Sequence, residues 1–332
     1  MLKPPSLKEF PLYPVTLAIA GISVAVTGLW WSGWDIDPVA MNWRVWTRWE
    51  LWRAITSIFP HVNFFHLAFN LYWFWVFGTL LERVYGHVNF LVIVLLLALG
   101  SSLADFMLLE GGVGLSGVGY GLWAMLWVLE RRDARFNGAV DSHTSQTFVA
   151  WFFLCIILTF FDIMPVANIA HAAGAGLGAL LGLIGATSGQ TKNRTVAQLV
   201  AVFVALFLGS TFFWPWVNCS KEAGSEIERA GLDAMDRGNK SKAVKLLEVA
   251  AGRKNAPARA WYNLGIAYQR NDDYPNALRA YEKASNLPDA DPDIQKSARD
   301  LKEYLEFKKY LESNIQTLTN SAYNPGTSRN TN

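Results

Sequence analysis

The chain has 332 residues, 52% of them hydrophobic, and a formal net charge of +2. A charge so close to zero argues against a nucleic-acid partner. Its two cysteines, Cys155 and Cys219, provide neither a disulfide framework nor metal-ligand spacing. We therefore expect no metal and no cofactor.

Charged residues are sparse up to residue 218 and dense beyond it, which predicts a membrane part followed by a water-soluble part. A helix of about 20 apolar residues is long enough to cross a bilayer. Seven apolar segments approach this length: 13–33, 64–85, 88–109, 114–130, 147–165, 168–187 and 195–217. No small-residue cleavage pattern follows the first, so we expect a retained span. The segments predict an all-α, polytopic membrane bundle.

The basic residues of the short loops predict the orientation, because cytoplasmic loops are enriched in Lys and Arg. With the N-terminus inside, the outer loops hold Arg44, Arg48 and Arg53. The inner loops then hold a larger set: Lys3, Lys8, Arg83, Arg131, Arg132, Arg135, Lys192 and Arg194. We expect a cytoplasmic N-terminus and, after an odd number of spans, an extracytoplasmic C-terminal part.

Tryptophan is concentrated in the outer loop 34–60. Trp43, Trp46, Trp49 and Trp52 occur at every third position, interleaved with Arg and Glu. Aromatic and charged residues in this pattern are typical of a helix that lies in the headgroup layer. We expect one helical segment there.

Polar residues inside the spans are candidates for function, because placing a polar group at membrane depth is costly. In the second span His66 and Asn70 are four residues apart and share a helix face, and His61 lies just above them. In the fourth span Ser116 and Tyr120 have the same spacing. The sixth span carries one histidine, His171.

Small residues predict that the fourth and sixth spans pack closely. The fourth carries Gly117 and Gly121, and the sixth carries Gly174, Gly178 and Gly182 on the face of His171. Glycine faces of this kind let two helix backbones approach each other in a membrane. The Ser116 hydroxyl could therefore meet a ring nitrogen of His171.

A serine beside a histidine favours acyl-transfer chemistry. The imidazole removes the hydroxyl proton as the oxygen attacks a carbonyl, and then protonates the leaving amine. The oxyanion needs donors, which Asn70, His66 and the backbone N–H of Ser116 could supply. The residues alone leave open a packing role for Ser116, and Asp105 in the third span is an alternative acid for a triad.

These motifs resemble the rhomboid family of intramembrane serine proteases, over about residues 10–188. The matching features are His61, His66 and Asn70 in H-x4-H-x3-N, Gly114-Leu115-Ser116-Gly117, Ala170-His171 with Gly174 and Gly178, and the Trp52-Arg53 pair. The resemblance implies a Ser116–His171 dyad without an acid and an oxyanion site of His66, Asn70 and the Ser116 backbone. It also implies that Tyr120 packs against the imidazole and that the other matching residues have supporting roles.

The resemblance also sets the expected organisation and activity. We expect a six-helix rhomboid-like core in residues 1–188 and a seventh transmembrane helix in 189–218. The protein would be an integral membrane endopeptidase, in a bacterial inner membrane, that cuts transmembrane proteins at or near the outer leaflet. The alternative from another class is a catalytically silent relative that binds membrane proteins as an adaptor.

The water-soluble part contains a repeat of 34 residues, seen in Gly231 and Gly265, Ala243 and Ala277, and Ala250 and Ala284. The second copy resembles a tetratricopeptide repeat, with Trp261, Leu264, Gly265, Tyr268, Ala277, Tyr281, Ala284 and Pro288 in place. Residues 224–257 are a weaker copy, and 292–314 read as a capping helix. We expect a repeat domain over 219–318 that binds a protein or peptide partner or a second copy of itself, and a disordered tail at 319–332.

Overall fold

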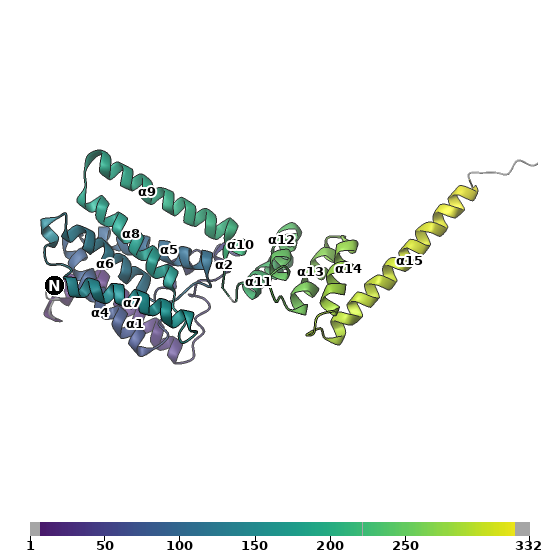
Figure 1. Cartoon of the computed structure of the whole chain (residues 1–332), viewed down its shortest axis with the longest axis horizontal. Helices are drawn as coiled ribbons and strands as arrows, with labels where there is room; N and C mark the ends of the chain where they lie inside the picture. The colour runs from purple at the N-terminus through teal and green to yellow at the C-terminus, as the bar shows by residue number, and fades with distance from the viewer. Residues whose placement is uncertain (1–6, 221, 323–332) are drawn as a thin grey trace, which may run out of the picture. The chain divides into compact units, whose positions relative to one another are not determined.

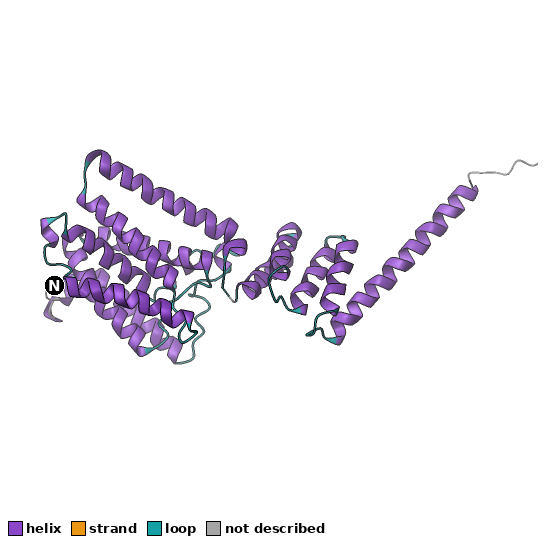
Figure 2. Ribbon diagram, in the orientation of Figure 1, coloured by secondary structure: helices purple, strands orange, loops and turns teal. Residues whose placement is uncertain are grey.

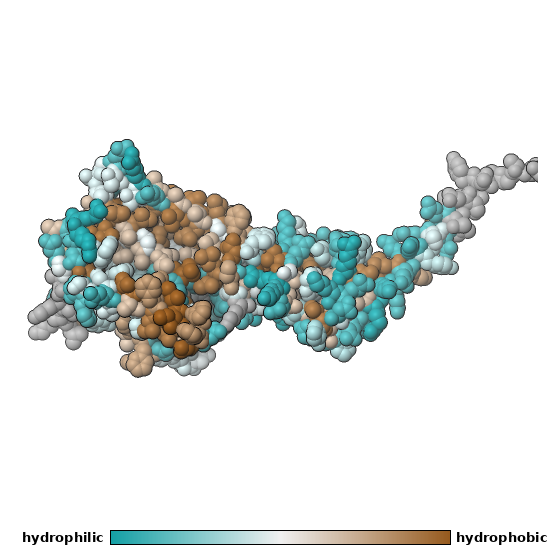
Figure 3. Space-filling view, viewed as in Figure 1, coloured by the Kyte–Doolittle hydropathy of each residue, from teal (hydrophilic) through white to brown (hydrophobic). Residues whose placement is uncertain are grey.

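Every regular element in the described residues, 7–220 and 222–322 of the computed structural model, is a helix (Figure 2). This confirms the all-α prediction. The chain divides into two compact units, Met1–Ala223 and Gly224–Asn332. The first presents a largely hydrophobic surface and the second a largely hydrophilic one (Figure 3). The change in charge density along the sequence corresponds to this division.

The first unit contains the helices that the apolar segments predicted, with short additional turns (Figure 1). They are η1 (Leu7–Leu12), α1 (Pro14–Trp31), α2 (Arg44–Thr47), α3 (Arg53–Thr56), α4 (Phe64–Tyr85), α5 (His87–Leu108), α6 (Ser116–Glu130), η2 (Ala134–Phe136), α7 (Ser142–Phe160), α8 (Asn168–Ala186), α9 (Gly189–Leu208), η3 (Gly209–Phe213) and α10 (Trp214–Val217).

Within the described ranges, six helical segments are long and apolar enough to cross a membrane: α1, α4, α5, α7, α8 and the run Gly189–Val217 from α9 to α10. The fourth predicted span differs, because α6 has 15 residues and starts only at Ser116. Glycines delay its start, and Gly114 has a φ of +112°, which an L side chain rarely adopts. Most residues of α6 are buried, so this helix lies inside the bundle.

A buried carboxylate joins α1 to α4. Glu82 of α4 is 1% exposed and accepts hydrogen bonds from the backbone N–H groups of Val15 and Thr16, each at 2.9 Å. These N–H groups belong to the first turn of α1 and have no partner within that helix. Glu82 therefore caps α1 and fixes where it starts.

The segment 34–60 does not form the single helix that its tryptophan spacing predicted. Two short helices, α2 and α3, are separated by Trp49, whose φ of 57° lies in the left-handed region. Trp43 and Trp46 are buried, whereas Trp49 and Trp52 are exposed. Two of these four tryptophans thus point inward, and the prediction of one continuous surface helix was wrong.

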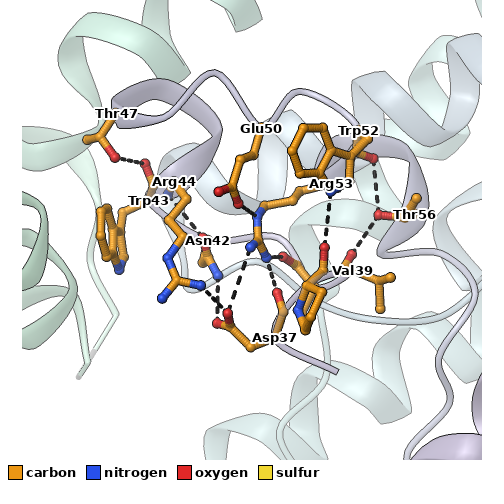
Figure 4. A network of polar contacts seen from close by, with 12 residues as sticks. Asp37, Val39, Asn42, Trp43, Arg44, Thr47, Glu50, Trp52, Arg53 and Thr56 are labelled. Carbon is orange, nitrogen blue, oxygen red and sulfur yellow. Dashed lines mark hydrogen bonds and ion pairs between the residues drawn. The ribbon is translucent and has the colours of Figure 1, made fainter. Parts of the chain in front are cut away.

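Arg53 explains why the loop folds back on itself (Figure 4). Its side chain is 3% exposed and pairs with Glu50. Its guanidinium also donates to the backbone carbonyls of Asp37 and Ala40, the latter at 2.9 Å. A buried guanidinium must have its N–H donors satisfied. Arg53 therefore holds Asp37, Ala40 and Glu50 close to one another.

The second unit contains paired helices: α11 (Ala223–Asp236, beginning one residue before the unit), α12 (Lys240–Ala251), α13 (Ala258–Arg270), α14 (Tyr274–Ser285) and α15 (Pro292–Ala322). Its two copies make equivalent close contacts. A Cβ added to Gly231 would lie 2.7 Å from Leu247, and one added to Gly265 would lie 2.5 Å from Tyr281. Leu247 and Tyr281 are themselves 34 residues apart, so the same small-to-large contact packs each pair.

The last helix is longer than the sequence predicted. The capping helix was expected over 292–314, but α15 continues to Ala322, into the segment predicted as a disordered tail. The remainder of that tail, 323–332, lies outside the described residues.

Candidate active site

Two helices approach each other closely enough to bring their backbones into contact. A Cβ added to Gly174 of α8 would lie 2.0 Å from the carbonyl oxygen of Gly117, and one added to Gly178 would lie 1.9 Å from that of Gly121. Real Cβ atoms do not come this close, so only glycine fits at these positions of α8. The glycine faces read from the sequence therefore hold α6 and α8 together.

This contact places Ser116, the first residue of α6, beside His171 in the first turns of α8. The Ser116 Oγ and His171 Nε2 atoms are 2.8 Å apart, within hydrogen-bond distance. The imidazole is 3% exposed, whereas Ser116 is half-buried. The arrangement has the geometry of a nucleophile beside a general base.

The imidazole is held from its face. The Tyr120 ring stacks on it with centroids 4.6 Å apart and an interplanar angle of 24°. The Tyr120 hydroxyl donates to the Phe148 carbonyl at 3.1 Å, which fixes that ring in turn. The buried Nδ1 atom of His171 has no hydrogen-bond partner. Among the described residues, no carboxylate is hydrogen-bonded to the His171 ring.

The predicted oxyanion donors His66 and Asn70 lie in the first two turns of α4. The His66 ring lies against Gly114, where an added Cβ would be 2.6 Å from His66 Cε1. Asn70 is 5% exposed, and its side-chain amide donates to the His66 carbonyl at 2.9 Å. That bond uses one amide hydrogen and leaves the second for another acceptor.

His61 joins the loop before α4 to the loop before α6. It is fully buried, its Nδ1 lies 2.9 Å from the Phe59 carbonyl, and its Nε2 accepts from the backbone N–H of Leu115 at 3.3 Å. Burial and the neighbouring His66 lower its pKa from the ordinary 6.5 to about 3. A neutral His61 therefore holds the residue before Ser116.

Asp105 has a role that the sequence reading did not identify. Its carboxylate is not bonded to His171 but accepts from the backbone N–H of Ala170 at 3.2 Å, and the backbone of Gly112 is a second hydrogen-bonding neighbour. Asp105, Gly112, Ser116 and Ala170 line one small cavity. The signal in the sequence that could have identified Asp105 was its charge within an apolar span. In the structure this carboxylate binds backbone N–H groups.

Asn218 is a second residue that the sequence reading missed. Its side-chain amide donates to the carbonyls of Phe106, at 3.0 Å, and of Leu109. The backbone N–H of Cys219 donates to the Leu108 carbonyl at 2.8 Å. The chain after α10 therefore satisfies the last carbonyls of α5.

The Trp52-Arg53 pair lies at the start of α3, in the segment between α1 and α4. The Trp52 indole donates to the Pro38 carbonyl at 3.1 Å, and Arg53 gathers the loop as described above (Figure 4). Both residues organise the loop backbone.

A family model of the rhomboid domain matches residues 48–188, which include the Ser116–His171 pair and its neighbours. Residues 48–188 of the chain therefore match a rhomboid domain. A tetratricopeptide-repeat model matches residues 258–285 of the second unit. The rhomboid domain and the C-terminal repeat confirm the two resemblances read from the sequence.

Curated relatives include the rhomboid protease GlpG of Salmonella paratyphi A, Salmonella newport and Salmonella typhi. Each is 32% identical over 151 residues, which is 45% of this chain and 51% of the relative. The chain thus spans about half the length of the curated relatives it matches. The rhomboid domain is an integral membrane domain, in keeping with its apolar helices.

Proposed function

We propose that the rhomboid domain is an intramembrane serine endopeptidase with a Ser116–His171 dyad. The observation that carries this proposal is the 2.8 Å separation of Ser116 Oγ and His171 Nε2 at the contact of α6 with α8. The relatives whose printed name is rhomboid protease add to it. The reaction needs no metal or cofactor in its steps.

The chemistry divides into acylation and deacylation. His171 Nε2 takes the Ser116 proton as Oγ attacks the scissile carbonyl, and the same proton then goes to the leaving amine. Water, deprotonated by His171, hydrolyses the acyl-enzyme and regenerates Ser116. The Asn70 amide, the His66 ring and the Ser116 backbone N–H are the proposed donors to the oxyanion.

A serine-directed fluorophosphonate tests the proposal. Wild-type protein should be labelled and should cut a transmembrane substrate, and Ser116→Ala or His171→Ala should do neither. Ser23→Ala is the matched control, because it removes the hydroxyl of a buried serine on a different helix, α1. Equal behaviour of the wild type and Ser116→Ala would reject the protease and support the silent adaptor.

The substrates that suit this site are transmembrane proteins cut at or near the outer leaflet. The excess of basic residues in the alternate loops supports a cytoplasmic N-terminus. The ends of α4, α6 and α8 that carry His66, Ser116 and His171 would then face the extracytoplasmic side, as would the repeats. The repeat domain would then recruit a substrate or partner beside the site. Stacked helix pairs of this kind offer a surface for peptides and helices.

A further inference from the structure

We infer that Asp105 is a positioning residue for the dyad, and that Asn218, directly after α10, anchors the end of α5 that carries Asp105. The inference rests on the proposed function, because it concerns the Ser116–His171 pair. Three sets of backbone contacts near the end of α5 support the inference.

The first contact is between Asp105 and α8. Ala167, at the start of α8, makes no side-chain capping bond. The N–H of Ala170 in the first turn has no partner within its own helix, and in a water-free bundle an unsatisfied N–H is costly. Asp105 supplies the acceptor from α5 at 3.2 Å. It therefore fixes the first turn of α8, immediately before His171.

The second contact is between Asp105 and the loop that leads to the nucleophile. A Cβ added to Gly112 would lie 3.4 Å from Asp105 Oδ2, so the loop backbone passes directly beside the carboxylate. Gly112 lies four residues before Ser116 in the sequence. One side chain therefore touches the backbone near both members of the dyad and sets their separation.

The third contact is the anchoring of α5 by the chain after α10. Helix α5 ends at Leu108, and its last carbonyls lack partners within the helix. The Asn218 amide and the Cys219 N–H satisfy those of Phe106, Leu108 and Leu109. Phe106 directly follows Asp105, so Asn218 steadies the turn of α5 that carries the carboxylate. The repeat unit begins soon afterwards in the sequence, at Gly224.

The test of Asp105 measures kcat and KM on a transmembrane substrate, with melting temperature in parallel. Asp105→Ala should lower kcat by about 30- to 100-fold, as expected for misplaced reacting groups, with KM within about twofold. Asp105→Asn keeps one acceptor for Ala170, so its kcat should fall by less than about tenfold. Glu82→Ala is the matched control, since it removes a carboxylate cap from α1.

Glu82→Ala should lower the melting temperature and leave the kcat of the folded protein within about threefold of wild type. A wild-type kcat in Asp105→Ala would overturn the assignment. So would equal losses in Asp105→Ala and Asp105→Asn, or the same kcat loss in Glu82→Ala as in Asp105→Ala.

The test of Asn218 uses Asn218→Ala and, as its control, Asn89→Ala. Asn89 also donates to a helix carbonyl, that of Tyr85, at the other end of α5. Asn218→Ala should lower kcat by about tenfold with unchanged KM, and Asn89→Ala should not. Equal kcat in Asn218→Ala and wild type would remove the anchor from the inference.

Hydrogen exchange separates this inference from the proposed function. In full-length Asp105→Ala protein, exchange should quicken in peptides covering 109–116 and 167–172, and in Asn218→Ala it should quicken in 104–112. This readout does not depend on proteolysis. If exchange quickens in the variants but the wild-type protein cleaves no substrate, the proposed protease function is rejected and the contacts are kept. If exchange in the variants equals that of the wild type, the contacts are rejected.

Discussion

His171 is oriented by an aromatic face instead of an acid. Its Nδ1 has no partner, and the stacked Tyr120 ring at 4.6 Å is the neighbour that limits its rotation. Stacked aromatic pairs contribute about 0.5–1.5 kcal/mol beyond the area they bury. That amount is enough to favour one ring orientation over others, and thus to hold Nε2 toward Ser116.

Two substitutions of Tyr120 should therefore distinguish the contribution of its ring to kcat from that of its hydroxyl. Tyr120→Phe keeps the stacked face, so we expect kcat within about threefold of wild type. Tyr120→Leu removes it and should lower kcat by about 10- to 100-fold, because the imidazole is then free to rotate away from the Ser116 hydroxyl. Fluorophosphonate labelling rates and substrate cleavage would measure both. Equal losses would assign the effect to the Tyr120–Phe148 hydrogen bond.

His61 predicts a pH dependence of stability. Its pKa is about 3 in the folded protein against 6.5 ordinarily, so the unfolded chain binds the additional proton between these values. Stability is fully present above about pH 6.5 and is lost as the pH falls toward 3, with roughly 2 kcal/mol gone at pH 5. Unfolding of the detergent-solubilised protein between pH 7.5 and 4.5 would measure this loss.

The comparison that isolates His61 is His61→Gln, which offers an amide donor and acceptor but does not titrate. The variant should lose less stability than wild type over the same pH range. Parallel pH profiles would assign the acid sensitivity to other groups. The physical reason for the difference is that a proton on Nε2 removes the acceptor for the Leu115 N–H.

At the scale of elements, the contact of α6 with α8 has no room for a methyl group. Gly178→Ala would place a Cβ 1.9 Å from the Gly121 carbonyl oxygen, so the helices must separate. We expect loss of cleavage and a lower melting temperature. Gly176→Ala, on the same helix, meets nothing within 4 Å. It should keep activity and gain about 0.5–1 kcal/mol from helix propensity. A fully active Gly178→Ala would contradict the close contact.

The sequence predicted the elements that depend on local pattern. Apolar runs located the spans, and glycine spacing on α8 predicted its contact with α6. The sequence did not predict that α6 starts only at Ser116, because a glycine can adopt many backbone angles and its presence does not show which one it has. Nor did it predict the break at Trp49 or the roles of Asp105 and Asn218, because each follows from a partner distant in the sequence.

For the whole molecule, the orientation in the membrane is the first matter to test. Cys219 is exposed and Cys155 is buried. In intact cells, a thiol reagent that does not cross membranes should label Cys219, because the inner loops carry the excess of Lys and Arg. Cys155→Ala serves as the control that assigns the signal. Labelling only after lysis would place the C-terminal unit inside the cell.

Removal of the repeats should affect recruitment and leave the chemistry intact. A chain ending at Ala223 keeps all seven predicted helices, Ser116, His171 and Asn218. It should cut a generic membrane substrate at the wild-type rate and cut the native substrate more slowly when that substrate is dilute. A tethered binding module raises local concentration to about the millimolar range, which matters little at excess substrate. Equal slowing on both substrates, with a lower melting temperature, would contradict recruitment.

The anchoring of α5 by Asn218 also imposes an order in time on biosynthesis. Phe106 and Asn218 are 112 residues apart in the chain. At about 5–20 residues per second, the ribosome needs roughly 6–22 s to go from one to the other. Ser116 and His171 are both made within that interval, while the carbonyls at the end of α5 still await their partner. The nascent chain thus holds both members of the dyad before it holds the residue that steadies them, and that corner of the protein is completed only when the residues after α10 have been made.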